Sequence, residues 1–199
     1  MDAAIQKWIE NGDETAILEL DDLDMEELPE LPKNLQKLYY QGCYFKKLPE
    51  LPPNLQKLEC YNCPNLKEIP KLPESLQSLY CRYCSELKEL PELPANLQLF
   101  SCFDCPIKGI PELPTSLQEL HCSSCPIEKL PSSLQYLNCY NCYELKELPE
   151  LPSSLQYLNC YNCYELKELP ELPLNLQKIS CYDCPIESLP AILPSKVSL

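Results

Sequence analysis

The chain has 199 residues and a formal net charge of −14, from 16 Lys and Arg against 30 Asp and Glu. Because binding to nucleic acid or to an anionic membrane surface needs a basic patch, we expect neither partner class. There are 22 Pro and 15 Cys but only 3 Gly. Such a bias over the length of one domain indicates a repeat rather than a mixed globular fold.

The first predicted element is a short helix. Asp2 supplies an N-cap, and Ile5, Trp8 and Ile9 fall on one helical face. We expect residues 1–14 to form a helical cap, with Trp8 covering the core of the first coil. No basic stretch is followed by an apolar one, so a secretory signal peptide is not expected. Many Cys in such a chain indicate reduced thiols in a cytoplasm.

A pattern L-Q-x-L-x-C-x-x-C then recurs through residues 15–188, in steps of 20 or 21 residues with one exception. Its copies begin at Leu55, Leu76, Leu97, Leu117, Leu134, Leu155 and Leu176, and an earlier copy at Leu35 has Tyr in place of the first Cys. In a strand, the second Leu and the first Cys point to one side and their neighbours to the other. Each of about nine coils therefore contributes one short strand to a parallel sheet.

The segments between these strands read K-E-L-P-E-L-P. Proline fixes φ and donates no backbone hydrogen bond, which disfavours a helix and favours an extended backbone. Lys and Glu neighbours such as Lys146-Glu147 indicate a solvated face that keeps the chain soluble. Residues 189–199 form a short apolar tail, which we expect to close the other end.

One coil is short. Only 17 residues separate Cys122 from Cys139, because Pro131 runs directly into the next Ser-Ser pair and one E-L-P unit is missing. The loss removes about 10 Å of extended chain. We expect this coil to cut across the core and to tighten the curvature locally.

The pattern predicts an α/β repeat that is mostly β: a leucine-rich-repeat solenoid with short parallel strands on its concave face, a non-helical proline-rich convex side and a short N-terminal capping helix. The phrase L-P-E-L-P-x-x-L-Q-x-L resembles the repeats of bacterial effectors of the YopM and IpaH/SspH type. The cysteine-rich array also resembles repeat proteins of giant viruses and intracellular bacteria. The resemblance implies a protein-interaction module, with an effector-like role. IpaH-type proteins also carry a ubiquitin-ligase domain, whereas only about fifteen residues follow Cys184 here.

The repeated C-x-x-C pairs have three interpretations. Two pairs can supply a four-thiolate zinc site, stacked coils bring Cys pairs within disulfide range, and C-x-x-C is also a redox motif. Every pair falls at the repeat phase, however, and the first Cys takes an inward strand position where a small apolar residue is wanted. We therefore expect core packing, with no metal and no cofactor.

The single His, His121, takes an outward strand position. Nucleophilic catalysis needs a base held by a third group inside a pocket, which an open sheet does not supply. We expect an exposed surface side chain and no enzyme activity.

Aromatic residues gather at outward strand positions. The candidate binding residues are Tyr61, Tyr80, Arg82, Phe103, Tyr136, Tyr140, Tyr157, Tyr161 and Tyr182. Tyr and Arg are enriched at interfaces, and Tyr with Ser and Asn is the composition of antibody paratopes. The alternative is that stacked rings only stabilise neighbouring strands.

These observations predict a protein that binds a protein partner through its concave face, and we expect a monomer. Two alternatives stay open. One is a substrate-recognition arm of a ubiquitin-ligase-type effector that lacks its catalytic domain. The other is a cysteine-rich metal-binding or redox array.

Overall fold

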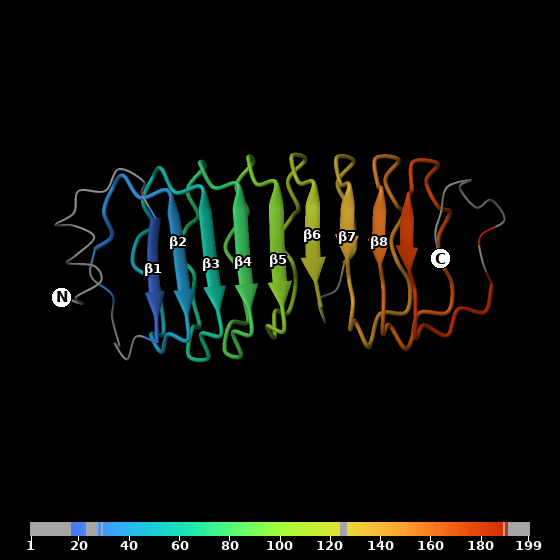
Figure 1. The fold of residues 1–199 in the computed structure, drawn as a ribbon, viewed down its shortest axis with the longest axis horizontal. Coiled ribbons are helices and arrows are strands. Elements are labelled where there is room, and N and C mark those ends of the chain that lie inside the picture. The colour runs from blue at the N-terminus through green and yellow to red at the C-terminus, as the bar shows by residue number, and fades with distance from the viewer. Residues whose placement is uncertain (1–16, 23–27, 29, 124–126, 189, 191–199) are drawn as a thin grey trace.

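The computed structural model describes residues 17–22, 28, 30–123, 127–188 and 190. The predicted cap at residues 1–14 and nearly all of the predicted tail at 189–199 lie outside them. Nine strands form one parallel sheet in chain order (Figure 1). They are β1 (Ile17–Asp21), β2 (Lys37–Gln41), β3 (Lys57–Tyr61), β4 (Ser78–Arg82), β5 (Leu99–Phe103), β6 (Glu119–Cys122), β7 (Tyr136–Asn138), β8 (Tyr157–Asn159) and β9 (Lys178–Ser180).

The strands alternate as the repeat predicts. In β3, Leu58 and Cys60 are fully buried, while Lys57 and Glu59 are only partly covered. Neighbouring strands repeat the arrangement in register, so that Leu58 lies opposite Leu79 in β4. The inward residues of successive coils thus stack into one continuous core, which no single coil could bury alone.

The chain returns between strands without helix: none of the described residues is helical. Leu151 and Leu172 on the returns are buried and cover the core from the convex side. Each return ends in a tight turn, as where Leu155 N–H donates to the carbonyl oxygen of Pro152 at 3.0 Å. The predicted combination of short parallel strands with a non-helical, proline-rich convex side is therefore confirmed for the described part of the chain.

The cysteines form two columns inside the solenoid. The first column continues the strand core, with Cys60 and Cys81 fully buried. Thiols of the second column reach back to the preceding coil: Sγ of Cys84 lies 3.6 Å from the carbonyl oxygen of Cys60, and Sγ of Cys105 lies 3.3 Å from that of Cys81. Among the described cysteines, each thiol of the second column therefore ties its coil to the one before it by a side-chain hydrogen bond.

The short coil does not disturb the sheet. Leu120 of β6 pairs with Leu137 of β7, and His121 pairs with Asn138, in the same relation as in the other strand pairs. Gln135 N–H also donates to the carbonyl oxygen of Gln118 at 2.8 Å, as its counterparts do in the longer coils. The strand register is therefore kept across the short coil.

No helix in the described residues is long and apolar enough to span a lipid bilayer.

Candidate functional site

The concave face carries the outward side chains of the nine strands, and its first half is charged. Nζ of Lys57 lies 4.8 Å from the ring centroids of both Tyr39 and Tyr80 and 3.3 Å from a carboxylate oxygen of Glu59. The guanidinium of Arg82 lies 5.1 Å from the Tyr80 ring. Cations held over ring faces in this way are stabilised within the chain itself. The structure thus brings the predicted binding residues Tyr80 and Arg82 together, and they already form a cation–π contact with each other.

A second set of rings runs along the edge of this face, where the strands end. Tyr61 meets Tyr83 edge-on at 5.4 Å between centroids, Tyr83 meets Phe103 at 5.9 Å, and Phe103 stacks on Tyr140 at 4.5 Å. We call Tyr61, Tyr83, Phe103 and Tyr140 the aromatic ridge. The intervening coil places the small, buried Ser123 at this position, so that Phe103 and Tyr140 meet across it.

The ridge changes the part expected of two predicted binding residues. Phe103 is only 7% exposed, so it supports its neighbours rather than offering its own face to a partner. Tyr140 packs toward Phe103, whereas Tyr161 stacks on Tyr182 at 6.1 Å. The predicted tyrosine column is therefore divided into two groups of rings.

Sequence reasoning missed Tyr83, although a signal for it exists. Among the described residues, a residue with a left-handed backbone follows every strand except β6, directly after β1–β5 and three positions after β7–β9. These residues are Asp22, Gly42, Asn62, Tyr83, Asp104, Asn141, Asn162 and Asp183. Gly, Asn and Asp tolerate positive φ, whereas a bulky residue there costs roughly 1–2 kcal/mol. Tyr83 has φ 58° and is 42% exposed. A strained, exposed ring at a position suited to Asn or Gly is typical of a functional surface.

The second half of the concave face is aromatic, with Glu119 beside Tyr136 at one end and Lys178 beside Tyr157 at the other. Tyr136 lies 5.9 Å from Tyr157 between ring centroids, and Tyr161 stacks on Tyr182. We call these four residues the C-terminal tyrosine patch. Tyr157 is 38%, Tyr161 37% and Tyr182 73% exposed. Rings that stay this open on a rigid sheet offer contact area at little cost in side-chain entropy.

Asparagines hold the backbone beneath these rings. Tyr161 N–H donates to Oδ1 of Asn159 at 3.1 Å, and Tyr140 N–H donates to Oδ1 of Asn138 at 3.3 Å. The side-chain oxygen of each asparagine is thereby held against the backbone two residues further on.

His121 lies next to the patch, in a setting that does not resemble a catalytic base. Its Nε2 lies 3.8 Å from a carboxylate oxygen of Glu119, its Nδ1 lies 3.4 Å from Nδ2 of Asn138, and its ring lies 5.1 Å from that of Tyr136. Burial lowers the pKa of His121 below its usual range, which keeps the ring neutral near pH 7. Its recorded neighbours are a carboxylate, an amide and a ring rather than a nucleophile.

The cysteines have the surroundings of core residues. Burial raises the pKa of the Cys60 and Cys81 thiols well above their usual range, and hydrogen bonding to Cys84 raises that of Cys105. A protonated thiol is a poor nucleophile and a poor metal ligand. Among the described residues, no cluster of three or more His, Cys, Asp and Glu side chains is arranged to hold a metal ion.

Comparison with known proteins identifies the repeat. A leucine-rich-repeat family model matches residues 116–137. YopM from Yersinia enterocolitica WA-314 is 30% identical with a TM-score of 0.60, and the alignment covers 99% of this chain and 53% of that one. The chain therefore spans about half the length of that YopM. No curated protein sequence matches.

Two effector domains share the fold at lower identity. The leucine-rich-repeat domain of the type III effector XopL is 23% identical with a TM-score of 0.71, covering 92% of this chain and 75% of that one. A Shigella effector leucine-rich-repeat domain is 23% identical with a TM-score of 0.63, covering 94% and 76%. The predicted resemblance to effector-type leucine-rich repeats is confirmed.

Proposed function

We propose that this chain, a leucine-rich-repeat protein by its sequence and its fold, is a non-catalytic module that binds a protein partner through its concave face. The C-terminal tyrosine patch is the proposed centre of contact. One observation carries the proposal: Tyr157, Tyr161 and Tyr182 remain well exposed on neighbouring coils of a rigid sheet. The charged half of the face is instead engaged by its own rings at Tyr39 and Tyr80.

The similarity to effector domains supports an effector-like role, in which the module holds or sequesters a protein. Leucine-rich-repeat domains of this kind occur in the type III effector XopL and in a Shigella effector. The buried thiol columns favour a reducing compartment such as a cytoplasm. A net charge of −14 disfavours nucleic acid and anionic membranes as partners. The proposal requires only a single copy of the chain.

The test begins with affinity capture from the lysate of the natural host, followed by measurement of the dissociation constant for the purified partner. Tyr161→Ala is expected to weaken binding by about 1–3 kcal/mol, as truncation of a hot-spot residue does. Glu147→Ala, on the exposed convex side of the preceding coil, is the control and should leave the affinity unchanged.

Two results would contradict the proposal. If Glu147→Ala weakens binding and Tyr161→Ala does not, the concave face is the wrong surface. If Tyr161→Ala instead unfolds the protein, the rings are a structural ladder, and their exposure no longer argues for a partner.

A further inference from the structure

The short coil keeps both ends of its return segment and loses the middle. Leu134 N–H donates to the carbonyl oxygen of Pro131 at 3.1 Å. In the next coil, Leu155 N–H donates to the carbonyl oxygen of Pro152 at 3.0 Å. The two turns are equivalent, so Pro131 takes the place that Pro152 has in a coil of full length.

This equivalence identifies what is missing. Leu130 takes the place of Leu151. Relative to the return from Cys142 to Pro152, the return from Cys125 to Pro131 lacks four residues, among them a triplet equivalent to residues 148–150, which read Leu-Pro-Glu. In the full-length coil Leu148 is buried, 7% exposed. The short coil therefore lacks one apolar side chain that would cover the convex side of the core, together with its proline.

The convex surface is hollowed on both sides of the short return. A hollow of about 910 Å³ lies between this return and those of the next two coils, and one of about 610 Å³ lies on the other side, toward Gly109. Glu128, Lys129 and Leu130 line both. We call the larger one the convex hollow. Its volume is in the range of sites that hold compact ligands or short peptide segments.

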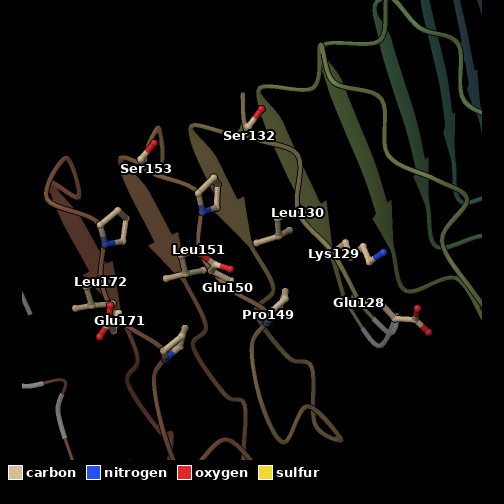
Figure 2. A pocket seen from close by; sticks show the side chains of 13 residues that line it. Glu128, Lys129, Leu130, Ser132, Pro149, Glu150, Leu151, Ser153, Glu171 and Leu172 are labelled. Atoms are coloured by element: carbon tan, nitrogen blue, oxygen red, sulfur yellow. The ribbon is translucent and has the colours of Figure 1, made fainter.

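The convex hollow has an apolar floor that crosses three coils. Leu130, Leu151 and Leu172 lie in a row, with proline rings beside them (Figure 2). Leu151 and Leu172 are 7% exposed, and Leu130, at the short return, is more open. Among these three leucines, the floor is most accessible at Leu130.

The rim of the convex hollow is acidic. Glu128, Glu150 and Glu171 are exposed at its edge, and Lys129 is the one basic residue among those that line it. Figure 2 shows Glu150 and Glu171 beside Leu151 and Leu172. Because the rim carries three carboxylates and one ammonium group, it favours a positively charged ligand in the hollow.

We propose that the convex hollow is a second docking site, which binds a short, extended, basic segment of a partner protein containing Leu and Pro. Such a segment fits because the returns on either side are themselves extended and rich in proline. A polyproline-like chain has no internal hydrogen bonds to lose and enters with little ordering cost. The leucines of the bound segment would cover the apolar floor of the convex hollow. Its Lys or Arg side chains would meet Glu150 and Glu171.

The test uses the whole chain and a synthetic peptide of repeated Lys-Leu-Pro, titrated in a calorimeter or by NMR. Saturable binding is expected, and a peptide of repeated Glu-Leu-Pro should bind at least about tenfold more weakly because its charge matches that of the rim. Insertion of Leu-Pro-Glu between Lys129 and Leu130 restores a full-length coil and fills the hollow. This variant should fold, as judged by circular dichroism, and lose peptide binding by about tenfold or more.

Charge variants separate local recognition from attraction to an acidic chain. Glu150→Lys with Glu171→Lys should weaken binding by about tenfold, whereas Glu147→Lys with Glu168→Lys makes the same change in net charge on the same two coils and should not. Tyr161→Ala should leave peptide binding unchanged, so this site is tested independently of the concave face.

Three outcomes would overturn the proposal. The first is that wild type shows no saturable binding. The second is that the insertion variant, or the Glu150 and Glu171 pair, binds as tightly as wild type. The third is that sedimentation detects a dimer which the insertion abolishes, because the hollow would then hold a second copy rather than a partner segment.

Discussion

Replacement of Cys84 by Ala tests whether the thiol columns hold the coils together. The Cys84 side chain is fully buried, and its Sγ lies 3.6 Å from the carbonyl oxygen of Cys60 in the preceding coil. Loss of the weak thiol hydrogen bond costs about 0.5 kcal/mol. Loss of the buried sulfur, with the small cavity it leaves, adds about 1 kcal/mol. We therefore expect the free energy of unfolding to fall by about 1–2 kcal/mol.

The assay is equilibrium unfolding in urea, with reductant present and the transition followed by circular dichroism. Ser85→Ala is a matched control, because Oγ of Ser85 also donates to the preceding coil, to the carbonyl oxygen of Pro64 at 3.2 Å. Ser85 is exposed, so water replaces the lost bond and the change should stay within about 0.5 kcal/mol. If Ser85→Ala costs as much as Cys84→Ala, burial is not the source of the effect. If Cys84→Ala costs nothing, the column does not stabilise the solenoid.

Three further predictions concern other positions. Asn62 has φ 51°, so Asn62→Ala should lower the free energy of unfolding by roughly 1 kcal/mol and Asn62→Gly should not; equal effects in urea unfolding would contradict the backbone argument. Phe100 is fully buried, so Phe100→Ala should cost about 3–5 kcal/mol in the same assay, and a loss below 1 kcal/mol would be inconsistent with its packing. Tyr161→Ala removes one stacked pair with Tyr182 and should cost no more than about 1.5 kcal/mol in thermal unfolding, so a larger loss would favour the structural-ladder interpretation.

The repeat itself could be predicted because each coil carries the same local information. Leu58 and Cys60 alternate with polar neighbours, which specifies a strand and its inward face, and a proline-rich return excludes a helix. Stacking then follows, since the apolar face of one coil is buried only by the next. The parallel order of the nine strands and the burial of the cysteines needed no further information.

The surface was predictable only in part. The exposed positions of Tyr157, Tyr161 and Tyr182 follow from strand alternation. The exposed position of Tyr83 does not follow from strand alternation, because it depends on the left-handed turn after β4, which the strand pattern does not describe. That turn is marked in other coils by Gly, Asn or Asp, and this regularity was the available signal.

The sequence alone determined the strands, their inward faces, the non-helical returns and the place of the missing E-L-P unit. The tertiary structure decided how rings of different coils pair and where the surface is hollow. Phe103 meets Tyr140 because the coil between them offers only Ser123, and the convex hollow lies where the returns of three coils meet. Both outcomes depend on distances between separate coils, whereas strand alternation is a property of adjacent residues and is legible in the sequence.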